Sequence, residues 1–116
     1  MMDLNLTFSL LTGIAAACPD GFTVDKNTLE PITTGYSVAV AGTQNSFGNY
    51  GAARVITYAN NHPEINALGG WYNSENGQFY YDAVIICSTL SEALELAAAN
   101  DQIAIFNLNT LEEIRL

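Results

Sequence analysis

The strongest structural signal in this chain is a turn between two runs of strand-forming residues. Residues 68–73 and 78–87 are rich in aromatic and β-branched side chains, and the segment Ser-Glu-Asn-Gly at 74–77 separates them. An Asn-Gly pair readily adopts the positive φ angles that a tight hairpin turn requires. The two runs therefore predict a β-hairpin.

A helical pattern lies on each side of this hairpin. Before it, apolar residues recur at helical spacing between Gly48 and Pro63, and the proline ends the pattern. These apolar positions are Ala52, Val55, Ile56 and Ala59. After the hairpin, Thr89 and Glu92 form the capping box of a second helix, which Asn100 can end. We expect two amphipathic helices with the hairpin between them.

Further strands complete the order of elements. Residues 36–41 are typical of a strand, and residues 103–108 and 111–115 predict a closing hairpin. From Tyr36 the order is then β-α-β-β-α-β, followed by one more strand. This order predicts an α+β fold with a split β-α-β, ferredoxin-like sheet and both helices on one face. We expect one domain over residues 1–116, with this core at 35–116.

Residues 1–34 are expected to add an extension and a small hairpin to that core. Alternation of Leu4, Leu6, Phe8 and Leu10 predicts a strand, but residues 10–15 also fit a helical stripe, so strand and helix both stay open. Residues 22–25 and 28–32 predict a hairpin around a Lys-Asn turn. The sequence Asn-Thr-Leu-Glu at 27–30 recurs at 109–112, which indicates that both hairpins use one turn design.

The charge of the chain is unbalanced because basic residues are missing. Only Lys26, Arg54 and Arg115 oppose twelve Asp and Glu residues, which leaves a formal charge of −9. A negative field of this kind repels nucleic acid and favours basic partners. We therefore expect no direct nucleic-acid binding, and a partner protein with a basic surface.

Acidic and aromatic side chains are the candidate contacts with such a partner. The acidic candidates are Glu75, Asp82, Glu92, Glu95, Glu112 and Glu113, and the aromatic ones are Trp71 and Tyr72. The position of Asp82 in the middle of a predicted strand allows two outcomes. If helices cover its face, the carboxylate is buried and needs a hydrogen-bond donor; if the face is open, it is an ordinary solvated residue.

Enzymatic and metal sites find little support. The only histidine, His62, lies at a helix end beside Pro63, where an imidazole caps the last carbonyl groups. Zinc sites need Cys or His at close spacing, whereas Cys18 and Cys87 are far apart and are expected to be buried thiols. We expect a non-enzymatic protein without a cofactor or a metal.

The segment between the predicted strand at 36–41 and the first core helix carries an alternative function. A strand-to-helix loop offers free backbone N–H groups to anions, so a small molecule or nucleotide could bind there. The residues that would contact it are Thr43, Gln44, Asn45, Ser46 and Asn49. The simpler interpretation is a polar turn with Ser46 or Asn49 as the helix N-cap.

The location of the protein follows from its N-terminal segment. An apolar run ends at Cys18, as in a lipoprotein signal, but Asp3 stands where such signals are basic. No stretch is long enough to cross a bilayer. We expect a cytoplasmic protein with no membrane contact, which could form a homodimer through an edge strand or through the aromatic hairpin.

Several segments resemble a group of small uncharacterised proteins encoded on phages and conjugative elements of gut Bacteroidetes. They are residues 18–25 (CPDGFTVD), 35–39 (GYSVA), 43–48 (TQNSFG), 69–71 (GGW), 80–82 (YYD) and 102–106 (QIAIF). No catalytic motif comes with the resemblance. It implies a protein that antagonises host defence, such as restriction or CRISPR nucleases. A non-enzymatic inhibitor that occupies a basic surface of a host nuclease is the function expected from these features.

Overall fold

The second strand of the predicted hairpin is the longest strand and organises the sheet. A computed structural model describes residues 3–116. Its helices are α1 (Leu4–Ala17), α2 (Gly48–Asn61) and α3 (Leu90–Ala99), with a 3-10 turn η1 (Ala41–Thr43). Its strands are β1 (Phe22–Asp25), β2 (Tyr36–Ala39), β3 (Ser46–Phe47), β4 (Ala67–Asn73), β5 (Gln78–Cys87), β6 (Ala104–Asn107) and β7 (Glu112–Arg115). The predicted α+β class is confirmed.

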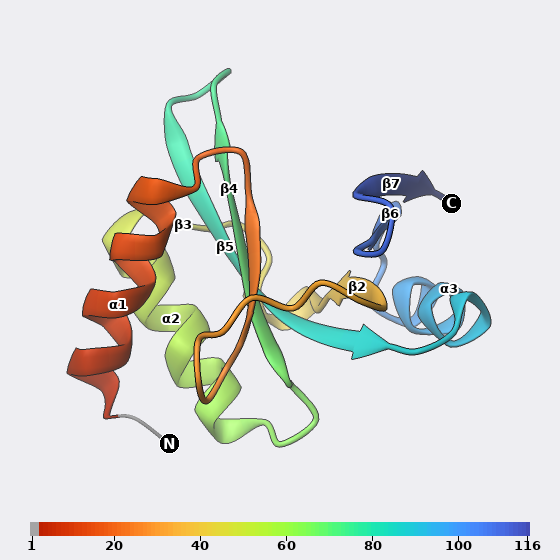
Figure 1. Cartoon of the computed structure of the whole chain (residues 1–116), viewed down its shortest axis with the longest axis horizontal. Coiled ribbons are helices and arrows are strands. Elements are labelled where there is room, and N and C mark those ends of the chain that lie inside the picture. Colours follow the sequence, from red (N-terminus) through yellow and green to blue (C-terminus); the bar gives the residue numbers. More distant parts are fainter. Residues whose placement is uncertain (1–2) are drawn as a thin grey trace.

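All strand pairs of the sheet are antiparallel, in the order β1-β4-β5-β2-β6-β7, and β3 pairs with β5. Strand β5 runs through the middle of the molecule (Figure 1). One of its edges pairs with β4 from the hairpin turn to Val84, and the other pairs first with β3 and then with β2. Between β2 and β3, η1 leaves the ladder, and the Thr43 hydroxyl accepts the N–H of Ala83 at 3.0 Å in place of a backbone carbonyl. The sheet has more strands than the predicted core.

The two faces of β5 differ because its side chains alternate between them. The odd-numbered residues face the helices: Tyr81 and Ala83 pack in one core cluster with α2, and Cys87 packs in a second cluster with Ala93 and Ala97 of α3. The even-numbered residues, Asp82 among them, lie on the opposite face. Both predicted helices have the expected ends, since Pro63 follows α2 and Thr89 caps α3 by accepting the N–H of Glu92 at 3.2 Å.

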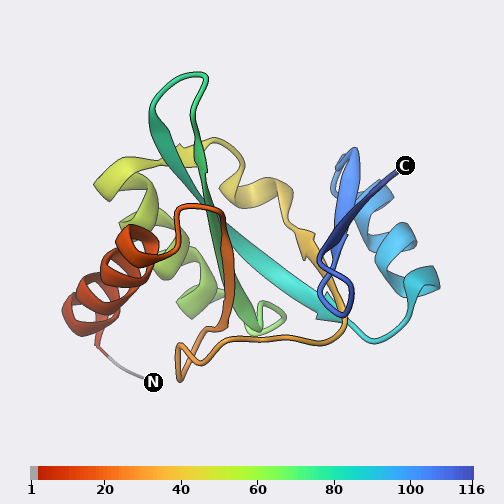
Figure 2. The same ribbon diagram turned by 45° about the horizontal axis from the view of Figure 1, so that its top comes forward.

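The N-terminal segment is a helix along its whole length, and the predicted strand at 4–10 is wrong. Asp3 caps α1, because its carboxylate accepts the N–H of Leu6 at 3.1 Å. Only Thr7, Leu11 and Ala15 are buried, at the i, i+4 spacing of one helix face. The alternating Leu4, Leu6 and Leu10 are each more than 40% exposed, so this alternation did not mark a buried sheet face. Helix α1 packs against α2 (Figures 1 and 2).

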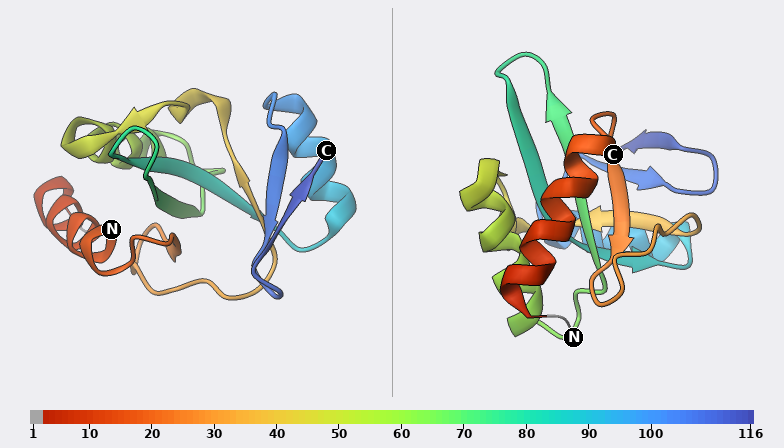
Figure 3. Two further views of the ribbon diagram at one scale, coloured as in Figure 1. Left: turned by 90° about the horizontal axis from the view of Figure 1, so that it is seen from above. Right: turned by 60° about the vertical axis from the view of Figure 1, so that its left-hand side comes forward.

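The predicted N-terminal hairpin is present in a shortened form. Strand β1 pairs with β4, but its return arm makes only one bridge, from Val24 to Pro31. The repeated sequence forms the same turn at both sites, since Leu29 and Leu111 each adopt φ near +60° and donate to a carbonyl four residues earlier. The second copy of the turn joins β6 to β7. These two strands and α3 lie at the end of the molecule away from α1 and α2 (Figure 3, left).

Candidate acidic interaction surface

Three carboxylates line a shallow cleft between α3 and β5. Glu92 and Glu95 come from α3, and Glu64 comes from the loop that joins α2 to β4. The cleft measures about 470 Å³. Its remaining lining residues are apolar or thiol side chains, namely Ile85, Cys87, Leu96 and Ala99. Every ionisable group of the cleft other than the thiol is thus acidic, above an apolar floor.

The end of β5 and the start of α3 position Glu92 within this cleft. Glu92 lies in the first turn of α3, and its carboxylate accepts hydrogen bonds from the hydroxyls of Thr89 at 2.9 Å and Ser88 at 3.2 Å, the two residues before the helix. A helix N-terminus stabilises negative charge, and these two contacts fix the position of the Glu92 carboxylate at the start of α3. Burial, together with the charge of Glu92, raises the pKa of the Cys87 thiol. The floor of the cleft therefore experiences a negative potential.

The other predicted acidic contacts lie elsewhere. Glu75 is exposed at the tip of the β4–β5 turn, and Asp82 lies on the sheet face opposite the helices. Glu112 and Glu113 lie on β7 at the edge of the sheet. The structure thus brings together Glu92 and Glu95 of the six and adds Glu64. Sequence reasoning missed Glu64 because no local pattern connects the residue after Pro63 with a helix 28 positions downstream.

Few of the acidic side chains are neutralised by the basic ones. Among residues 3–116 the single ion pair joins Arg115 and Glu113 at 3.0 Å. The Lys26 ammonium donates instead to the carbonyls of Ala59 and His62 at the end of α2. The Arg54 guanidinium likewise donates to Gly42, Gln44 and Ser46. Two of the three basic residues thus hold the backbone together and leave the cleft carboxylates without a counter-charge.

The two predicted aromatic contacts are exposed on opposite faces of the β4–β5 hairpin. Trp71 is 45% exposed and stacks on Tyr80, with ring centroids 5.4 Å apart. Phe47 of β3 packs against the same tyrosine, with ring centroids 5.4 Å apart. Tyr72 is 46% exposed and lies on the helix side, opposite Phe79 in the register. The hairpin therefore does not combine Trp71 and Tyr72 in one surface.

The alternative site at residues 43–49 is largely used for structure. Thr43 and Ser46 are buried, and Ser46 donates to the carbonyl of Thr43 at 2.7 Å while it accepts from Arg54 at 2.8 Å. Gln44, Asn45 and Asn49 are exposed. The predicted N-cap is wrong, since Phe47 occupies that position without a side-chain bond. Residue Ser46 packs directly on α2 at Gly51. This is possible only because Gly51 lacks a Cβ, which would lie 2.4 Å from the Ser46 carbonyl carbon.

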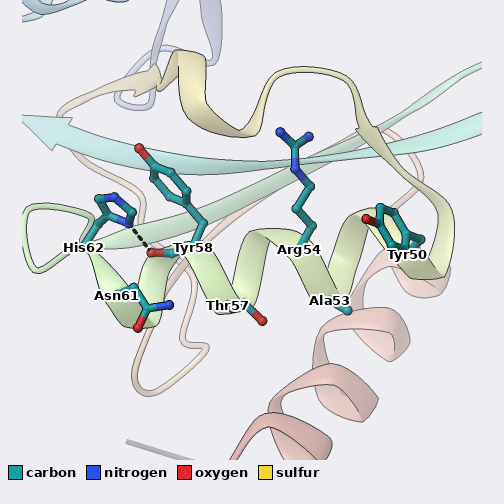
Figure 4. Close-up of a pocket in the computed structure, with 7 residues that line it drawn as sticks. All are labelled: Tyr50, Ala53, Arg54, Thr57, Tyr58, Asn61 and His62. Carbon is teal, nitrogen blue, oxygen red and sulfur yellow. Dashed lines mark hydrogen bonds between the residues drawn. The ribbon is translucent and has the colours of Figure 1, made fainter.

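A second hollow of about 460 Å³ runs along the outer side of α2. Figure 4 shows Arg54 and Tyr58 projecting from α2 toward the η1–β3 segment, and His62 at the end of the helix. The His62 Nδ1 lies 2.7 Å from the Tyr58 carbonyl, and the two rings stack with centroids 3.7 Å apart. The predicted capping role of His62 is confirmed. Arg54 and His62, the two basic side chains that line this hollow, are thus both bonded within the chain.

Within residues 3–116, no three His, Cys, Asp or Glu side chains are grouped as metal ligation requires. Cys18 and Cys87 are both free thiols; Cys87 is buried, as expected, whereas Cys18 is only partly buried. In the same range, no helix has the length and apolar character needed to span a membrane. Comparisons of the chain with known proteins found no matching family model, no similar curated protein and no similar solved structure.

Proposed function

We propose that this protein is a non-enzymatic binding module that recognises a basic segment of a partner protein through the cleft of Glu64, Glu92 and Glu95. The observation that carries the proposal is the combination of unpaired carboxylates with an apolar floor in one cleft. Such a surface complements an amphipathic segment, whose apolar side chains enter the cleft while Lys or Arg side chains contact the carboxylates.

The class of partner follows from the same charge argument. Basic surfaces of this kind are typical of proteins that bind nucleic acid. The resemblance to mobile-element proteins favours a host defence nuclease, which the protein would inhibit by covering the nucleic-acid site. We also propose that the four strands β4-β5-β2-β6, with α2 and α3 as connections, are a split β-α-β unit. The strand order and the packing of both helices on one face of β5 support this finer description.

A designed peptide tests the cleft directly. The probe is a synthetic helical peptide with a leucine stripe flanked by lysines, and a scrambled peptide of equal composition separates shape from charge. We expect the wild type to bind the amphipathic peptide more tightly than the scrambled one, with an affinity that falls as salt rises. The double variant E64K/E95K should bind it roughly tenfold or more weakly. Glu92 is left in place because its carboxylate accepts the hydroxyl of Thr89, the N-cap residue of α3.

The matched control is E30K/E75K, which changes the net charge equally at two exposed positions outside the cleft. We expect this control to retain most of the affinity. Equal losses in both double variants would mean that net charge alone drives binding, and the cleft would then have no special role. Absence of binding by the wild type at low salt would also contradict the proposal.

A further inference from the structure

The two ends of the sheet differ in how their outer edges are treated. At one end, the following segment of the chain covers β1. The backbone N–H of Asp25 donates to the Glu30 carbonyl, and the backbone N–H of Ile32 donates to the Thr23 carbonyl. At the other end, β7 pairs with β6 on one side and has no strand of residues 3–116 on its other side. An open edge is a template for pairing with another strand. Strand β7 is therefore the free edge of this sheet.

The register of β6 and β7 determines which backbone groups point outward. Leu116 donates to the Ile103 carbonyl at 2.9 Å, so its N–H is directed toward β6. In an antiparallel ladder the direction of the backbone groups alternates along the strand. The N–H and C=O groups of Ile114 therefore also point toward β6, and those of Glu113 and Arg115 point to the open side. Two residues of opposite charge thus present the free hydrogen-bonding groups.

The side chains of these two residues lie on one face of the sheet and already attract each other. Glu113 and Arg115 form an exposed ion pair at 3.0 Å. Charged residues commonly protect an open edge from pairing, because like charges from a second strand would repel. Here the two charges have opposite signs and are two positions apart. One antiparallel register, centred on the residue between them, places each charge opposite its complement.

We propose that two copies of the protein form a two-fold dimer through antiparallel pairing of their β7 strands, centred on Ile114. Glu113 of each copy then faces Arg115 of the other, and the outward backbone groups of both residues form the hydrogen bonds of the new ladder. The four charged side chains alternate in sign around the two-fold axis. This surface is separate from the acidic cleft, so the dimer does not depend on the proposed function.

Apolar side chains on the helix face extend the contact. Ile114 packs against the core cluster of α3 and, in this register, meets Ile114 of the second copy. Leu116 becomes the diagonal neighbour of that isoleucine. Leu116 and its neighbour Ile103, the residue before β6, are 54% and 69% exposed in the single chain. The two-fold axis is perpendicular to the sheet, so both copies present the α3 cleft on the same side of the joined sheet.

Charge substitutions test the register by analytical ultracentrifugation over a wide range of protein concentration. The wild type is expected to dimerise as concentration rises. E113R and R115E each place like charges opposite each other and should be monomeric. A mixture of the two variants restores both opposite pairs and should form a heterodimer, and the double variant E113R/R115E should dimerise again. A monomeric wild type, single variants that dimerise unchanged, or a mixture that stays monomeric would each overturn the proposal.

A cysteine scan provides a second test. In this register only residue 114 faces the same residue of the other copy. The two residues form a non-hydrogen-bonded pair, whose Cα atoms are about 4.5 Å apart. This separation is within the range that a disulfide can bridge. Under mild oxidation I114C should give a covalent dimer on non-reducing gels. E112C is the matched control, because residue 112 lies opposite residue 116 and far from its own copy. Equal cross-linking of both variants, or none of I114C, contradicts the two-fold centre at Ile114.

Discussion

The side chain of Asp82 shows how the position of one residue within a strand determines its chemistry. It lies on the face of β5 opposite the helices, beside the backbone of Gly69, and is half-buried. No donor among residues 3–116 bonds its carboxylate, which keeps contact with solvent. Burial raises the pKa of this carboxyl to about 6. Neither alternative derived from the sequence is correct, since the carboxyl is partly desolvated and yet has no donor among residues 3–116.

Because of this raised pKa, we expect the effect of Asp82→Asn on stability to depend on pH. The folded protein holds the proton more tightly than the unfolded chain, so the carboxyl favours folding at low pH, and this contribution is lost as the pH rises through about 6. We expect Asp82→Asn to raise the free energy of unfolding by on the order of 1 kcal/mol at about pH 8, and by much less at about pH 4. Urea unfolding at both pH values measures the difference. The exposed Glu75→Gln is the control, and an equal effect of Asp82→Asn at both pH values would contradict the prediction.

At the scale of elements, Arg54 joins α2 to the irregular segment that follows β2. Its guanidinium donates to the carbonyls of Gly42 and Gln44 and to the Ser46 hydroxyl, at 2.8 to 3.1 Å. Gly42 belongs to η1, Ser46 to β3, and Gln44 lies between them, where the edge of the sheet departs from a regular ladder. One guanidinium thus ties three polar groups of this irregular segment to α2.

Removal of this side chain should loosen the whole segment. We expect Arg54→Ala to lower the free energy of unfolding by about 1–2 kcal/mol, because three acceptors lose their donor. Arg54→Lys keeps the charge but lacks the planar fork, so most of the loss should remain. Thr57→Ala, on the exposed side of α2, serves as the control. Faster amide exchange at Thr43 to Phe47 would locate the effect, and unchanged stability of Arg54→Ala would contradict it.

The whole molecule carries a repulsive charge that its own contacts scarcely offset. The formal charge is −9, and residues 3–116 contain one ion pair, which is exposed. Like charges at this density disfavour the compact state, and salt screens them. The stability of the fold should therefore increase as ionic strength rises.

Added sodium chloride should stabilise the protein. Between about 0.01 M and about 0.15 M salt, we expect the thermal midpoint to rise by a few degrees, since screening weakens the repulsion. The test uses a chloride salt because sulfate would also strengthen the burial of apolar surface, which is a separate effect. The charge-reduced variant E30K/E75K should respond less than the wild type. A midpoint that falls as chloride is added would show that attractive pairs, and not repulsion, dominate the electrostatics.

Local sequence determined most elements because their signals act over a few residues. Asn76 and Gly77 in the turn, Thr89 at the N-cap of α3, Pro63 after α2 and the repeated turn with Leu29 and Leu111 each depend on backbone geometry close in the chain. Local pattern failed at α1, where an apolar segment matched two periods. Packing against α2 and the Asp3 cap selected the helix there.

The sequence by itself thus established the α+β class, the central hairpin, both core helices and the shortage of basic side chains relative to acidic ones. Tertiary structure alone decided which acidic residues share a surface, because that depends on contacts between distant segments. The fold brings Glu64 to Glu92 and Glu95, turns Asp82 to the opposite face and leaves β7 as the open edge. Side-chain type sets what a residue can bind, whereas strand order and register set which residues can bind together.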